Sequence, residues 1–255
     1  GHHWEGTLVI DKPLKIVGGS SDASRCVMEL TGSLHVTASA GHVVLVNLTL
    51  RRPRKVPEAT SCVYAQDSRV SLFNCIVNND GGHGSAIFVT GATSALDAMH
   101  IVVSGGSASG VAACGSKVCM FDSVVSRNGG AGVLLLDSFC ALERVTFLEN
   151  KGACVSVRGE NAAASLNACT ATDCSCAVER PEDGFVACRL CSGDDSAAGF
   201  YEYNWVGLKH KLEPPVKKPK VELPGQVPVL NHQQVLQQQH HAKLFQQQQQ
   251  QQQHT

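Results

Sequence analysis

The apolar residues of this chain recur in short runs that are separated by Gly, Asn, Asp and Ser. In the stretch AGVLLLDSFCALERVTFLENKGACVSV, residues 131–157, a run of branched apolar residues is interrupted at Asp137-Ser138. A second apolar run follows, is interrupted at residues 150–152, and is followed by a third. Short runs rich in β-branched residues with breaks of this kind are typical of strands joined by turns. Residues 1–207 carry no long stripe of period 3.6, which disfavours helical repeats.

Three columns of like residues recur along the chain at intervals of 21 to 27 residues. The first follows the pattern apolar, two residues, apolar or Cys or Ser, one residue, apolar: Leu45-Leu48-Leu50, Leu72-Cys75-Val77, Leu96-Met99-Ile101, Met120-Ser123-Val125, Leu142-Val145-Phe147, Leu166-Cys169-Ala171 and, in part, Cys188-Cys191. The second is apolar and follows a small residue each time: Val63, Ile87, Val111, Val133, Cys154 and Ala177. The third is polar: Asp80, Ser104, Asn128 and Asn150.

This repeat predicts a parallel β-helix. About 22 residues are too few for a strand and a crossover helix, which need roughly 30, but they suffice for two or three short strands with tight bends. Stacking one such rung on the next places like residues in ladders about 4.8 Å apart. We therefore expect an all-β solenoid over residues 1–207, with residues 51–60, RRPRKVPEAT, leaving it as a loop.

The repeats resemble those of right-handed parallel β-helices of the pectin-lyase-like class, and the handedness comes from this resemblance. Residues 4–18, WEGTLVIDKPLKIVG, are similar to the first coil of the β-helix domains in F-box substrate adaptors and in the SHC SH2-domain-binding protein. The resemblance covers residues 1–195 as a fold and only residues 1–18 as a subfamily feature. It implies that the parent protein is a substrate-binding adaptor of a ubiquitin ligase, with an F-box upstream of this chain.

The last 48 residues differ from the rest in composition and charge. We expect a Pro/Lys linker over residues 208–232, whose Lys217-Lys218-Pro219-Lys220 fits a minimal nuclear-import pattern, and a disordered Gln/His-rich tail over residues 233–255. Residues 208–255 hold six Lys and two Glu, a balance of +4, so that the total of −1 leaves −5 for residues 1–207. A mildly acidic body argues against nucleic acid as a partner, and no apolar run reaches the length of a membrane span.

A carbohydrate-active enzyme is the alternative reading of the same fold. The only candidate catalytic residues are Asp97, Asp122, Glu143 and Arg144. Asp97 and Glu143 are expected on outward positions two rungs apart, roughly 9.6 Å, and carboxylates beside an Arg suit Ca²⁺ and a base in a polysaccharide lyase, or the acid pair of a glycoside hydrolase. A charged face that limits stacking between molecules explains the same residues, and Trp and Tyr, on which sugars stack, are scarce. We therefore expect no catalytic set, no enzyme activity and no cofactor.

The 12 Cys fall mostly where the core needs volume, which favours reduced thiols and an intracellular location, cytoplasmic or nuclear. Cys174, Cys176, Cys188 and Cys191 also have spacings compatible with a four-sulfur zinc site, but as core fillers they need no metal. The basic residues Arg51, Arg52, Arg54 and Lys55 are candidates for gripping an acidic or phosphorylated protein partner, and a solvated loop is the alternative. The expected function is a protein-interaction module whose partners are other proteins.

Overall fold

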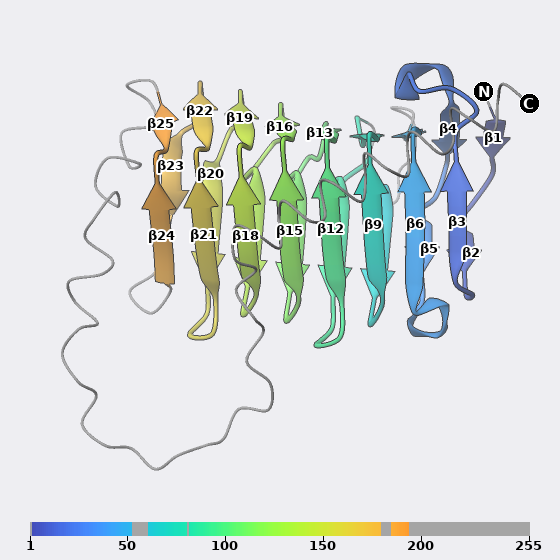
Figure 1. The fold of residues 1–255 in the computed structure, drawn as a ribbon, viewed down its shortest axis with the longest axis horizontal. Helices are drawn as coiled ribbons and strands as arrows, with labels where there is room; N and C mark the ends of the chain where they lie inside the picture. Colours follow the sequence, from blue (N-terminus) through green and yellow to red (C-terminus); the bar gives the residue numbers. More distant parts are fainter. Residues whose placement is uncertain (1, 53–60, 81, 180–184, 194–255) are drawn as a thin grey trace, which may run out of the picture. The chain divides into compact units, whose positions relative to one another are not determined.

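The computed structural model describes residues 2–52, 61–80, 82–179 and 185–193, and in these residues it confirms the predicted parallel β-solenoid (Figure 1). The chain divides into two units, Gly1–Glu213 and Pro214–Thr255, and every described residue belongs to the first. The boundaries predicted at residues 208 and 233 lie outside the described residues. No helix in the described ranges has the length and apolar character that a membrane crossing requires.

The strands form three parallel sheets, and each complete rung contributes one strand to each sheet. Sheet A comprises β1 (His2–Trp4), β4 (Val27–Leu30), β7 (Thr49–Arg51), β10 (Ile76–Asn78), β13 (Val102–Ser104), β16 (Val124–Ser126), β19 (Thr146–Leu148), β22 (Thr170–Thr172) and β25 (Ser192–Gly193). Sheet B comprises β2 (Leu8–Ile10), β5 (Leu34–Val36), β8 (Val63–Gln66), β11 (Ile87–Thr90), β14 (Val111–Cys114), β17 (Val133–Leu136), β20 (Ala153–Arg158) and β23 (Cys176–Glu179). Sheet C comprises β3 (Leu14–Val17), β6 (His42–Val46), β9 (Arg69–Phe73), β12 (Ala95–Met99), β15 (Lys117–Phe121), β18 (Phe139–Glu143), β21 (Ala163–Asn167) and β24 (Phe185–Arg189). Two 3₁₀ helices, η1 (Ala23–Arg25) and η2 (Ala38–Ala40), lie in longer connections of the first rungs.

The rungs turn at residues in the left-handed region of φ, which bend the chain sharply enough for the next strand to begin within a few residues. The corner after sheet C uses such a residue in seven successive rungs: Asn47, Asn74, His100, Asp122, Arg144, Ala168 and Leu190. The corner after sheet A uses Gly105, Arg127, Glu149 and Asp173, and the corner after sheet B uses Asp67, Gly91, Gly115, Asp137 and Gly159. The Gly, Asn and Asp breaks that punctuate the sequence are therefore mainly these corners.

The lumen is filled by ladders of apolar side chains that alternate with outward positions along each strand. In sheet C the ladder of the first column runs through Leu45, Leu72, Ala98, Met120, Leu142, Leu166 and Cys188. These side chains are at most 8% exposed. Fully buried Phe147 in β19 is the one ring among the largest buried side chains of the described residues. A narrow lumen of this kind favours Leu, Val, Ile, Ala and Cys, as the composition indicates.

Three predicted ladder assignments were wrong by one or two residues. Ala98, not Leu96, pairs with Met120, and Leu96 pairs instead with Val118. Leu96 and Ala98 point to the same face because side chains alternate with period two, so the apolar pattern does not distinguish the two registers. In the second column Val133 pairs with Val155 rather than Cys154, and Val155 with Val178 rather than Ala177.

The polar column is confirmed for Asn128 and Asn150, whose side chains are buried and hydrogen-bonded to each other. Asp80 and Ser104 were wrong members, because Asp80 is exposed and Ser104 pairs with Ser126 in sheet A. A second buried polar column, which was not predicted, lies at the corner after sheet B and is formed by Ser68, Ser94, Ser116 and Ser138. These serines donate to or accept from backbone groups of neighbouring rungs, which satisfies polar groups that the bends would leave without partners.

Candidate functional site: the outer face of sheet B

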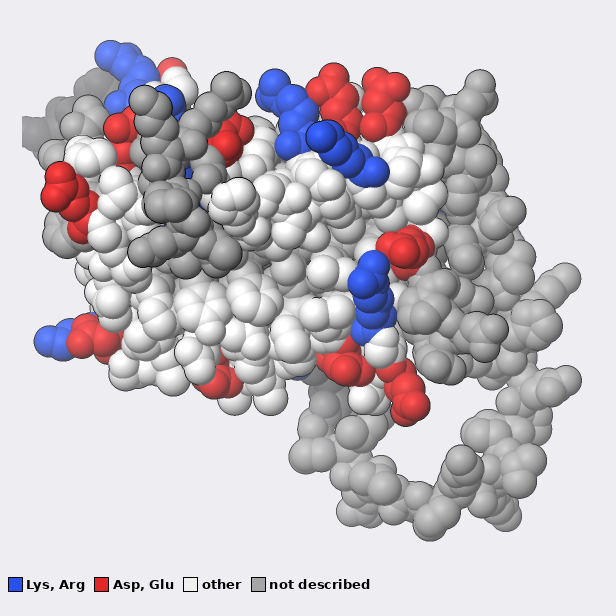
Figure 2. Space-filling model, turned by 180° about the vertical axis from the view of Figure 1, so that it is seen from behind, with Lys and Arg blue, Asp and Glu red and all other residues white. Residues whose placement is uncertain are grey.

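The outer face of sheet B carries no charged side chain on six successive strands, from β2 to β17. Its outward positions are Val9, His35, Tyr64, Gln66, Phe88, Thr90, Ala112, Cys114, Leu134 and Leu136. Figure 2 shows this broad uncharged surface, with acidic and basic residues gathered at its margins. We call these ten residues the uncharged face.

Three rings are stacked along the centre of the uncharged face. His35, Tyr64 and Phe88 occupy the same position in three successive strands. The ring centroids of His35 and Tyr64 are 4.7 Å apart, and those of Tyr64 and Phe88 are 5.6 Å apart. In-register parallel strands hold like positions about 4.8 Å apart, so the fold itself sets this stacking. The rings are therefore fixed before any partner arrives.

His35 contributes to the apolar character of this face. Burial lowers the pKa of its imidazole, because the charged form loses solvation. Its Nε2 atom has no hydrogen-bond partner among the described residues. Burial therefore favours the uncharged form of the ring, which extends the apolar surface.

The uncharged face ends at a polar margin on the last two strands of sheet B. Ser156 donates to Glu179, with 2.8 Å between Oγ and Oε2, and Arg158 lies 3.5 Å from the same carboxylate. Sheet C differs throughout its length, since its outward positions carry Lys15, Arg69, Asp97, Lys117, Glu143 and Arg189. An uncharged core with a polar rim is the usual arrangement of a protein-binding surface.

The four candidate catalytic residues do not form the expected pair of carboxylates. The position two rungs from Glu143 on its ladder is Met99, whereas Asp97 lies two residues before Met99 in β12 and pairs with Cys119. The Cα atoms of Asp97 and Glu143 are therefore about 12 Å apart rather than about 9.6 Å. Asp97 Oδ2 is bound by Arg69 Nε at 2.6 Å. The expected juxtaposition was wrong by the same register shift as Leu96.

Asp122, Glu143 and Arg144 do lie together, at the corner after sheet C. Arg144 Nε and Nη2 donate to the two carboxylate oxygens of Asp122 at 2.6 and 2.9 Å, and Arg144 also contacts Glu143. These bonds lower the pKa of Asp122 and raise that of Arg144. The guanidinium engages both carboxylates, and this favours a surface ion-pair cluster over an acid and base held apart across a substrate.

A comparison with protein families identifies the fold. Residues 33–191, more than half of the chain, match the family described as right handed beta helix region. The chain belongs to the right-handed β-helix family. Neither the search of curated proteins nor the search of solved structures found a match. Family membership fixes the handedness of this β-helix and leaves its function to the surface residues.

This β-helix also places a histidine beside a serine, which sequence reasoning missed because the two are 29 residues apart. His42 Nε2 and Ser71 Oγ are 2.8 Å apart on the outer face of sheet C. A Ser–His pair is the core of many hydrolase sites. Ser71 is in the middle of β9, however, and the backbone of β9 is paired with β6 and β12 on either side. A flat, fully paired sheet does not offer the oxyanion donors that such chemistry needs.

The cysteines of the zinc alternative are distributed over the last rungs of the β-helix. Cys191 interacts with Cys188 and Cys169, while the Cys174 sulfur lies 3.8 Å from Asn150 Nδ2. Cys176 is only partly buried in β23. In the described part of the chain, no group of three or more His, Cys, Asp or Glu side chains is arranged to hold a metal ion.

The basic residues predicted to grip a partner separate in the structure. Arg51 is exposed in β7, with Nη1 3.9 Å from Glu29 Oε1. Arg52 is fully buried and donates from Nη2 to the carbonyl oxygen of Thr31 at 3.3 Å, so a surface role for Arg52 was wrong. Arg54 and Lys55 lie outside the described residues.

A signal for the ring stack is present in the sequence. Val63, Ile87, Val111 and Val133 of the second apolar column point into the lumen, so the residue after each of them points outward. For the column members Val63 and Ile87, the following residues are Tyr64 and Phe88. The rule extends the outward row to Ala112 and Leu134, and it would have revealed the uncharged face.

Proposed function

We propose that this β-helix is a non-catalytic protein-interaction module and that the uncharged face binds the partner. The observation that carries the proposal is the in-register stack of His35, Tyr64 and Phe88 on a face without charged side chains. Cores of protein interfaces are depleted of charged residues and enriched in aromatic ones. Because the rungs hold these rings in place, little side-chain entropy is lost on binding.

The finer part of the proposal is that the parent protein is a substrate-binding adaptor of a ubiquitin ligase. The similarity of residues 4–18 to the first coil of F-box adaptor β-helices supports it. Eight of the 12 cysteines are buried as small core side chains, which supports a reduced, intracellular setting, cytoplasmic or nuclear. An F-box in the coding sequence upstream of this chain would support this assignment, and a secretory signal peptide there would contradict it.

Site-specific photocrosslinking tests the module proposal. A photoreactive phenylalanine analogue replaces Tyr64 on the uncharged face or, in a matched variant, Phe73 on the outer face of sheet C. In living cells of the source organism we expect a discrete protein adduct from position 64 that is lost when Phe88→Glu is added, and no such adduct from position 73. Equal adducts from both positions, or none from position 64, would contradict the proposal.

The rival function is a polysaccharide lyase or glycoside hydrolase that acts on carbohydrate. The cluster of Asp122, Glu143 and Arg144 is the observation that favours it. Turnover of polygalacturonate with and without Ca²⁺ decides the matter. Cleavage by the wild-type chain that disappears in Glu143→Gln would establish the enzyme, and we expect no cleavage by either protein.

A further inference from the structure

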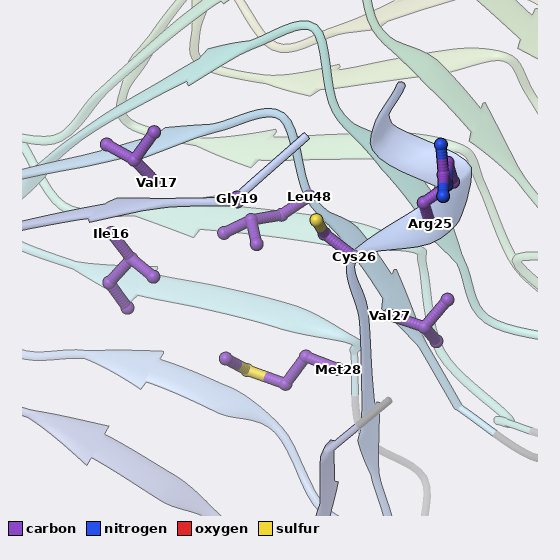
Figure 3. Close-up of a pocket in the computed structure, with 9 residues that line it drawn as sticks. Ile16, Val17, Gly19, Arg25, Cys26, Val27, Met28 and Leu48 are labelled. Carbon is purple, nitrogen blue, oxygen red and sulfur yellow. The ribbon is translucent and has the colours of Figure 1, made fainter. Parts of the chain in front are cut away.

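The corner between β3 and β4 differs from every later corner after sheet C. Two residues connect β6 to β7, and the same holds for each described rung that follows, whereas residues 18–26 connect β3 to β4 and include η1. This longer connection leaves a pocket of about 350 Å³ beside the lumen. Figure 3 shows Ile16, Cys26, Met28 and Leu48 around the pocket and Arg25 on the 3₁₀ helix at its edge.

The pocket is lined by apolar groups whose ladder neighbours in the next rung are buried. Ile16 pairs with Leu45 and Met28 pairs with Leu50, and both partners are fully buried in the lumen. Ile16 and Met28 themselves are only partly buried, although they pack against the same core. Apolar surface of this kind gains free energy when an apolar ligand covers it.

The connection that forms the pocket is held in place by side chains of later rungs. Asn74 Nδ2 donates to the carbonyl oxygen of Ser21 at 2.7 Å, and Thr49 Oγ1 donates to that of Ala23 at 2.9 Å. Asp22 caps η1 by accepting from the Ser24 amide at 3.0 Å. The pocket is therefore largely preformed, which lowers the entropic cost of filling it.

One charged residue lies at the edge of this apolar space. Of the nine lining residues, Arg25 alone is charged, and its side chain has no ion pair within 4.0 Å among the described residues. We propose that this pocket binds a small amphipathic carboxylate, with its hydrocarbon body against Ile16, Met28 and Leu48 and its carboxylate on the Arg25 guanidinium. Planar guanidinium groups bind carboxylates through paired, charge-assisted hydrogen bonds.

The methyl signals of the three methionines of the chain report directly whether a ligand binds in the pocket. Met28 lines the pocket, Met99 is exposed on sheet C, and Met120 is fully buried in the lumen. In the full chain labelled with ¹³C at the methionine methyl groups, titration with octanoate is expected to shift Met28 to saturation. The Met99 and Met120 signals stay in place, and Met120 also reports that each variant remains folded.

A comparison with octan-1-ol and two variants of the chain test two points. They are whether Arg25 binds the carboxylate and whether the pocket is the binding site. We expect octan-1-ol to bind at least about tenfold more weakly than octanoate, and Arg25→Gln to remove that difference. Gly19→Leu should abolish both shifts, because a Cβ at Gly19 meets no atom within 4 Å and the longer side chain occupies the opening. No saturable shift of Met28, equal shifts of Met28 and Met99, or equal affinity for acid and alcohol in the wild type would overturn the proposal.

Discussion

Asn128 donates from Nδ2 to Oδ1 of Asn150 on the next rung at 2.9 Å, and both side chains are 1% exposed. Asn150 Oδ1 also accepts from the Asn128 amide at 3.2 Å, and its Nδ2 donates to the carbonyl oxygen of Val125 at 2.9 Å. The Gly106 amide donates to Asn128 Oδ1 at 2.9 Å. This pair therefore serves the backbone at the corner after sheet A, where the regular ladder of sheet hydrogen bonds stops.

Asn150→Ala should lower the free energy of unfolding by about 2–4 kcal/mol, because it leaves several buried polar groups without partners. Urea unfolding followed by circular dichroism measures the change. Asn161→Ala, at an exposed position in the bend after sheet B, is the matched control and should change stability by less than about 0.5 kcal/mol. Equal effects of the two substitutions would show that the buried pair contributes nothing specific.

Two phenylalanines in consecutive strands allow the contribution of lumen packing to stability to be compared with that of surface contacts. Phe147 is fully buried in the lumen, whereas Phe139 is 43% exposed on sheet C. We expect Phe147→Ala to cost about 3–5 kcal/mol through lost burial and a cavity, and Phe139→Ala less than about 1 kcal/mol. Thermal and urea unfolding of both variants test this, and a larger loss for Phe139→Ala would contradict the assignment of the inner face.

Ala168 lies at a corner in the left-handed region, with φ of 52°, so its replacement by glycine is expected to stabilise the protein. Ala168→Gly should raise the free energy of unfolding by about 0.5–1 kcal/mol, because glycine adopts this region without the clash of a Cβ atom. Ala164→Gly in β21 is the control. It should lower stability by about 1 kcal/mol, since Ala164 is 1% exposed and lies in a strand. If Ala168→Gly destabilised as much as Ala164→Gly, the corner would not have this backbone conformation.

The half-buried imidazole of His35 predicts a loss of stability in acid. Its pKa is lowered in the folded protein, whereas the unfolded chain has the ordinary value near 6.5. Below that value the unfolded state binds more protons than the folded state, so the free energy of unfolding falls as the pH decreases from about 6.5. His35→Phe should reduce this slope in urea unfolding measured between pH 7.5 and 5, and an unchanged slope in this variant would contradict the prediction.

The period of the repeat determined the fold, but it did not determine the register in every rung. Adjacent ladder members differ by 26 residues from Leu72 to Ala98 and by 22 from Ala98 to Met120. Because residues two apart in a strand face the same side, Leu96 fitted the lumen as well as Ala98. This register error led to the prediction that Asp97 lies two rungs from Glu143. The structure has Met99 at that position of the ladder.

The candidate site was harder to predict than the core because it depends on what lies side by side across rungs. Tyr64 and Phe88 are single aromatic residues in the sequence, and only their shared register makes them a stack. His42 and Ser71 likewise meet only when β6 and β9 are paired. The burial of Arg52 could not be predicted either, since its short basic segment is typical of a solvated loop.

The central claim is that the uncharged face binds a protein partner, and the affinity of that partner for two matched variants tests it most directly. The protein that crosslinks at position 64 is purified, and its Kd is measured by calorimetry for the wild type, Phe88→Glu and Phe73→Glu. We expect Phe88→Glu to weaken binding at least about tenfold, because it places a charge at the centre of the interface, and Phe73→Glu to change Kd by less than about twofold. Equal losses, or a larger loss for Phe73→Glu, would contradict the account.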